Sequence, residues 1–192
     1  MTQITIMRRF CGLILLLVVA VRGLAFGQSP APTTPPSSGV ELRAGLASVV
    51  ITPSEPMWMA GYAARTERSQ GALHDLQAKA LALEDKEGDR IVIVSCDLLG
   101  FPRDLAARIA ERAEDEFQLR REQLLLNASH THTGPVVEGS LVGAYELTLE
   151  DQTRIRAYTQ RLEDSIVGVI GRALAGLARL GSPSGTGWPG SA

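Results

Sequence analysis

Two histidines two positions apart are the residues of this sequence that most directly suggest chemistry. His130 and His132 lie within the segment Asn127–Pro135, and the neutral imidazole is the commonest nitrogen ligand for zinc. In an extended backbone, residues i and i+2 point to the same side, so we expect both rings to face one site. Two solvated or capping histidines would have the same spacing, and the spacing by itself leaves both interpretations open.

A catalytic zinc ion needs three protein ligands and an open position. The sequence offers His74 as a further ligand and Glu138 as a further ligand or a base, although a solvated loop residue is the simpler interpretation of each. Asp97 directly follows an apolar, β-branched run. We expect its carboxylate to orient one imidazole through the second ring nitrogen.

Elements that can position these residues are visible in the apolar patterning. A charged turn with a glycine joins two apolar runs and predicts a β-hairpin. Pro102 suits the first position of a helix, and Thr148 with Asp151 resembles a capping box. The expected elements are strands over 41–52, 77–83, 90–96 and 124–126 and helices over 102–117 and 149–173.

This order predicts a mixed α/β fold, an α+β sheet with flanking helices. A β–α–β unit is expected around Asp97 and His130, and open α/β folds place ligands at the carboxyl ends of such strands. Gly134 and Pro135 force a turn just after the histidines. The histidine pair is therefore predicted at a loop rim beyond the end of a strand.

Composition excludes several classes of protein. The 192 residues are 45% hydrophobic and 21% charged, with a net charge of −2, which is ordinary for a globular chain and argues against wholesale disorder. The near-neutral balance argues against a nucleic-acid binder that relies on basic patches. Two cysteines are too few for a disulfide scaffold or a four-cysteine zinc site.

The two ends of the chain are predicted to lie outside the fold. Arginines followed by a short apolar run make residues 1–27 a secretory signal peptide, which predicts a secreted or periplasmic protein. Residues 28–39 form a Pro/Ser/Thr-rich linker, and residues 181–192 a low-complexity tail. Without residues 1–27 the basic residues fall from 19 to 16 against 21 acidic ones, a net charge of −5. Cys96 is then alone and is expected as a buried small hydrophobe.

Several segments together resemble the neutral/alkaline non-lysosomal ceramidase family. They are Met57–Tyr62, Lys79–Leu83, Asp97–Gly100 and, above all, Asn127–Pro135, and the resemblance extends over roughly 43–180. It implies a zinc amidohydrolase that cleaves the N-acyl bond of ceramide to sphingosine and a fatty acid. It also implies Zn2+ as the cofactor, a ceramide-like N-acyl lipid as the substrate, and contact with a membrane surface.

Carried over by position, the resemblance makes His130 a zinc ligand. His132 becomes a catalytic residue beside the metal, where it contacts substrate or supports the site. Asp97 matches a family position at the wall of the active site and is the second catalytic candidate. Gly61 and Tyr62 match a loop on the same wall and are expected to bind substrate.

The family's remaining zinc ligands, a histidine, a glutamate and a tyrosine, lie downstream of the stretch that this chain resembles. Residues 40–180 are therefore expected to be the N-terminal portion of a larger catalytic domain, with apolar faces left uncovered, and a truncation or frameshift near Gly181 would explain the tail. Two alternatives remain open. The chain is an inactive metal- or lipid-binding fragment, or it is a related metal-dependent hydrolase of another amide or ester.

Overall fold

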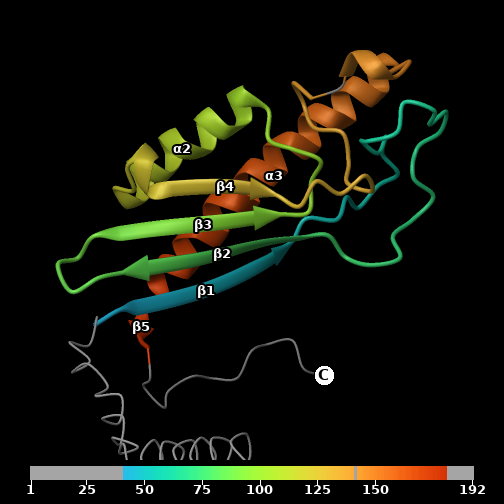
Figure 1. Ribbon diagram of the computed structural model, residues 1–192. Helices are drawn as coiled ribbons and strands as arrows, with labels where there is room; N and C mark the ends of the chain where they lie inside the picture. The colour runs from blue at the N-terminus through green and yellow to red at the C-terminus, as the bar shows by residue number, and fades with distance from the viewer. Residues whose placement is uncertain (1–40, 141, 181–192) are drawn as a thin grey trace, which may run out of the picture. The chain divides into compact units, whose positions relative to one another are not determined.

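The computed structural model describes residues 41–140 and 142–180 (Figure 1). The predicted signal peptide, linker and tail lie outside these residues. Five strands form one sheet in the order β4-β3-β2-β1-β5. The strands are β1 (Arg43–Val50), β2 (Gln77–Glu84), β3 (Arg90–Cys96), β4 (Leu124–Ala128) and β5 (Ala178–Arg179).

The predicted strands and hairpin are confirmed. β1 pairs antiparallel with β2, and β2 pairs antiparallel with β3 through the turn at Asp85–Asp89. β3 and β4 run parallel, as the predicted β–α–β unit requires. β5 is a two-residue strand beside the start of β1, too short to leave a periodic signal in the sequence.

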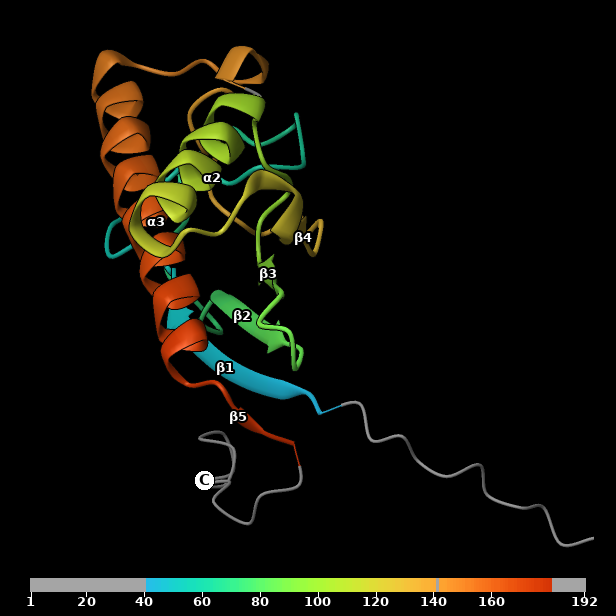
Figure 2. The same ribbon diagram turned by 90° about the vertical axis from the view of Figure 1, so that its left-hand side faces the viewer.

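The helices lie along one face of the sheet, as Figure 2 shows for α3 and, beside it, α2. α2 spans Arg103–Phe117 and α3 spans Leu149–Ala175, with short 3-10 turns η1 at Arg121–Gln123 and η2 at Val142–Ala144. α2 begins one residue later than predicted. Pro102 has a non-helical ψ of 146°, so it is the N-cap residue and not the first residue of the helix. The Pro102 carbonyl accepts from the N–H of Ala106 at 3.0 Å.

The predicted capping box of α3 is confirmed. The N–H of Asp151 donates to Thr148 Oγ1 at 3.2 Å, and the N–H of Thr148 donates to Asp151 Oδ2 at 3.0 Å. The predicted apolar face of this helix is buried throughout. It consists of Ile155, Tyr158, Leu162, Ile166, Ile170 and Ala173.

Small residues let α3 approach the sheet closely. Ala78, Ala80 and Ala82 form the buried face of β2. On β1, a Cβ at Gly45 would lie 2.0 Å from the Ala173 carbonyl oxygen, which is a steric clash. A larger residue at these positions would push the helix away from the sheet.

The opposite face of the sheet carries a row of apolar side chains. Leu46, Leu81, Ile93 and Leu125 are paired across four strands, and Leu46 and Leu125 are 59% and 57% exposed. No described helix covers this face (Figure 2). Among the described residues, no helix is long and apolar enough to cross a membrane.

Candidate functional site

The histidine segment leaves the sheet at the carboxyl end of β4, beside the end of β3. Backbone pairing continues past both strands, since the N–H of Ser129 donates to the Cys96 carbonyl at 3.0 Å and that of Thr131 donates to the Leu98 carbonyl at 3.2 Å. Because parallel strands end at the same edge, this pairing brings His130 next to the segment that follows β3.

His130 does not have the extended backbone that the sequence predicted. Its φ is +58°, in the left-handed region that only a few per cent of non-glycine residues occupy. The rings of His130 and His132 nevertheless meet, with centroids 5.3 Å apart and planes at 64°. The predicted juxtaposition is therefore present, but a left-handed residue produces it.

A backbone carbonyl fixes the ring of His130. Its Nδ1 lies 2.8 Å from the Leu99 carbonyl oxygen, and since a carbonyl only accepts, Nδ1 carries the proton in this pair. In the neutral ring the lone pair is then on Nε2. Metal-binding histidines are oriented in this way, by a hydrogen bond at the other ring nitrogen.

Asp97 does not orient an imidazole in this structure. Its Oδ2 accepts from the N–H of Gln77 at 2.9 Å, and its own N–H donates to the Gln77 carbonyl at 2.9 Å. The Asp97 carboxylate therefore ties the end of β3 to the start of β2. The hydrogen bond to His130 that was expected from Asp97 is made by the Leu99 carbonyl. A catalytic role for Asp97 stays a prediction.

The loop 51–76 brings the two predicted substrate-binding residues to His132. The Tyr62 ring contacts the His132 ring edge-on, with centroids 4.9 Å apart and planes at 70°. Gly61 has φ +107°, and a Cβ there would lie 2.6 Å from Cγ of His132. Backbone bonds from Ala60 to Gly134 and from Val136 to Trp58, both 2.8 Å, hold the loop against the histidine segment.

Arg65 completes this contact and was not predicted. One Nη donates to the His132 carbonyl at 2.8 Å, and the guanidinium carbon lies 5.3 Å from the centroid of the Tyr62 ring. A lone arginine in an irregular loop leaves no periodic signal. Its closeness in sequence to Tyr62 was the one available clue.

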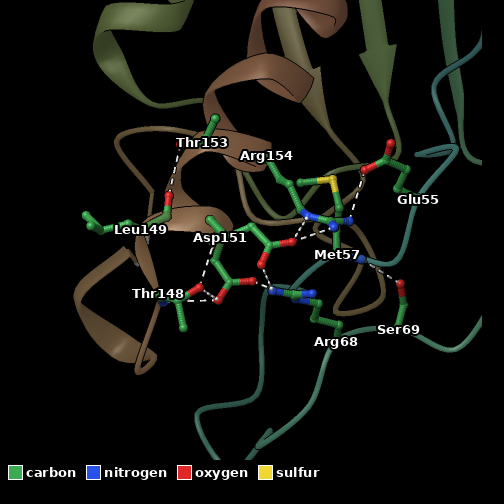
Figure 3. A network of polar contacts seen from close by, with 10 residues as sticks. Glu55, Met57, Arg68, Ser69, Thr148, Leu149, Asp151, Thr153 and Arg154 are labelled. Carbon is green, nitrogen blue, oxygen red and sulfur yellow. Dashed lines mark hydrogen bonds and ion pairs between the residues drawn. The ribbon is translucent and has the colours of Figure 1, made fainter.

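Ion pairs clamp the same loop to the start of α3 (Figure 3). Arg68 Nε donates to Asp151 Oδ1 at 2.7 Å, and Arg154 bridges Glu55 at 2.9 Å and Glu150 at 2.6 Å. Asp151 is buried. Burial by itself raises the pKa of its carboxyl, but hydrogen bonds from Arg68 and Thr148 outweigh this and hold the pKa at about 2.

The further metal ligands expected from the sequence are not gathered here. Among residues 41–140 and 142–180, no group of three His, Cys, Asp or Glu side chains is arranged to hold a metal ion. His74 and Glu138 are exposed loop residues. Burial raises the pKa of the Cys96 thiol to about 12, with a further contribution from Asp97, so Cys96 is a buried hydrophobe as predicted and not a thiolate nucleophile.

Gly61→Ala tests the contact between the loop and His132. We expect it to lower the free energy of unfolding by about 1–3 kcal/mol more than Gly88→Ala, because a new Cβ must displace His132. Gly88 has φ +88° with open space around it, so it controls for the backbone conformation. Urea unfolding measures the difference, and NMR signals of the His132 ring should shift only in Gly61→Ala. Equal destabilisation by the two variants would contradict the contact.

Asp151→Asn tests the clamp through its pH dependence. The folded pKa of about 2 lies below the ordinary 3.8, so the stabilisation is complete above about pH 4 and is lost as the pH falls to 2. We expect Asp151→Asn to cost about 1–2 kcal/mol at neutral pH and to flatten the acid dependence of unfolding. The exposed Glu150→Gln should cost under about 0.5 kcal/mol. An unchanged acid slope in Asp151→Asn would rule out the clamp.

Comparison with known proteins identifies the family. Residues 43–180 match the N-terminal region of neutral/alkaline non-lysosomal ceramidases. The fold is similar to neutral ceramidase from Pseudomonas aeruginosa, with a TM-score of 0.60 and 24% identity, and to a ceramidase complexed with C2, with 0.59 and 25%. Each comparison covers 73% of this chain, which spans only 22% of either solved chain. Because the family match extends over more than half of the sequence, the protein belongs to the neutral/alkaline non-lysosomal ceramidase family.

Proposed function

We propose that this chain supplies the N-terminal part of the catalytic unit of a zinc-dependent amidohydrolase, which cleaves the N-acyl bond of ceramide to sphingosine and a fatty acid. One observation carries the proposal. In a chain of the ceramidase family, His130 stands at the carboxyl end of a parallel strand with Nδ1 held by the Leu99 carbonyl at 2.8 Å, which leaves Nε2 for a ligand.

The residues present fit a part of a zinc site. His130 would be one ligand, and zinc, when bound, would polarise the amide carbonyl and lower the pKa of water. A catalytic zinc needs three protein ligands, and the described residues gather no such group. A complete zinc site therefore requires further ligands from polypeptide outside residues 41–180.

The neighbours of His130 have separate roles in this account. The edge-on contact with Tyr62 and the hydrogen bond from Arg65 hold His132, so its ring can support His130 or contact the substrate amide. Gly61 allows the loop to lie against His132 without a clash, and Tyr62, which is 55% exposed, presents its free surface to substrate. Asp97 keeps the ends of β2 and β3 together, which supports the segment that carries Leu99.

We place the activity outside the cytoplasm, in keeping with the predicted signal peptide. Contact with a lipid surface is supported by Leu73, which is 99% exposed in the loop 51–76. A metal- or lipid-binding fragment without turnover is the second candidate, and the absence of a three-donor group among the described residues favours it. Hydrolysis of another amide or ester is the third.

A chimera tests the proposed function. Residues 43–180 would replace the matching segment of the Pseudomonas aeruginosa ceramidase, and release of labelled fatty acid from ceramide would be measured. We expect the chimera to hydrolyse ceramide, with activity falling at least about 100-fold in His130→Ala, because loss of a ligand removes the metal. Arg103→Ala, which removes an exposed side chain at the start of α2, is the control, and it should leave the activity within about twofold.

If the activity of the chimera is low, its zinc content and circular dichroism spectrum distinguish loss of metal or of folding from loss of turnover. A folded chimera that holds zinc through His130 and leaves ceramide intact would contradict ceramide hydrolysis. It would favour the related hydrolase if another labelled N-acyl amide or ester is cleaved, and the binding fragment if none is.

A further inference from the structure

A groove of about 880 Å3 lies along the loop 51–76 and reaches the histidine segment at Thr133. Its size is within the range of small-molecule sites. Much of its lining is apolar, from Pro53, Pro56, Met59, Leu73 and Leu76. Arg65, which also holds the carbonyl of His132, lines the same groove.

Arg65 differs from the other arginines of this region. Arg68 pairs with Asp151, and Arg154 pairs with Glu55 and Glu150. Within residues 41–140 and 142–180, Arg65 forms no ion pair with a carboxylate, and its Nε is buried without a hydrogen-bond partner. Of the two carboxylates that line the groove, Glu55 pairs with Arg154, and Asp75 accepts from Thr52 Oγ1 at 3.0 Å.

A partly buried guanidinium with an unused donor is costly unless an acceptor completes it. Each Nη of a guanidinium carries two N–H donors, and a carboxylate accepts charge-assisted hydrogen bonds from such groups. The loop keeps the guanidinium in place through the Tyr62 ring, 5.3 Å away, and the His132 carbonyl. The groove thus presents, beside its apolar residues, a guanidinium that has no carboxylate partner among the described residues.

We propose that this groove binds a long-chain carboxylate, with Arg65 as the anchor of the carboxylate group and the apolar residues around the alkyl chain. The choice of ligand rests on the proposed function, because hydrolysis of an N-acyl amide releases a carboxylate at the end of an acyl chain. Arg65 would then act as a specificity residue that holds the acyl end of the substrate and product beside His132.

Binding of laurate to the full chain tests the proposal without requiring zinc or turnover. Isothermal titration calorimetry would compare laurate with dodecanol, which has the same chain length and no charge, both below the concentration at which they form micelles. We expect laurate to bind more tightly than dodecanol. Arg65→Gln should weaken the affinity for laurate at least about tenfold, the effect of losing a charge-assisted pair. It should change the affinity for dodecanol less than about twofold.

Two further variants separate charge from structure. Arg65→Lys keeps the charge and should retain part of the laurate affinity. Arg103→Gln removes an exposed arginine at the start of α2, outside the groove, and should bind laurate as the unchanged chain does. Thermal unfolding followed by circular dichroism verifies that each variant is folded.

Saturable laurate binding that is unchanged in a folded Arg65→Gln would overturn the proposal, as would equal affinity for laurate and dodecanol, or no binding of laurate to the unchanged chain. The outcome is independent of ceramide hydrolysis. Laurate binding that is weakened in Arg65→Gln would support the groove as a carboxylate site even if the chimera proved inactive.

Discussion

Parallel pairing of β3 with β4 is the constraint on which the candidate site depends. It runs in register from Val92 with Leu124 to Cys96 with Ala128, so both strands end at the same edge of the sheet. The two following segments remain hydrogen-bonded, and the Leu99 carbonyl thereby meets Nδ1 of His130. A hairpin connection could not give this geometry, because parallel strands need a crossover, which α2 supplies.

The loop 51–76 adds the second half of the site. Backbone bonds fix it to residues 134–136, and ion pairs fix it to the start of α3. Between these attachments the Arg65 guanidinium lies over the Tyr62 ring, and the Tyr62 ring contacts His132 edge-on, which in turn meets His130. The buried Asp151 carboxylate matters here because removing one partner of a buried pair leaves an uncompensated charge.

The sequence predicted those features that depend on local patterns. The hairpin, the capping box at Thr148 and the histidine pair at a strand end follow from periodicity and turn chemistry. Features set by distant contacts were missed. The ring of His130 bonds to the carbonyl of Leu99 and its backbone is left-handed. The Asp97 carboxylate accepts from a backbone N–H of β2, and Arg65 belongs to an aperiodic loop.

The central claim is that His130 presents Nε2 to zinc, and X-ray absorption at the zinc edge tests it most directly. In the zinc-loaded chimera, we expect outer-shell scattering from imidazole ligands. The amplitude per bound zinc should fall in His130→Ala and stay unchanged in His74→Ala. A spectrum of oxygen ligands only, or an imidazole amplitude that is unchanged in His130→Ala, would contradict the claim.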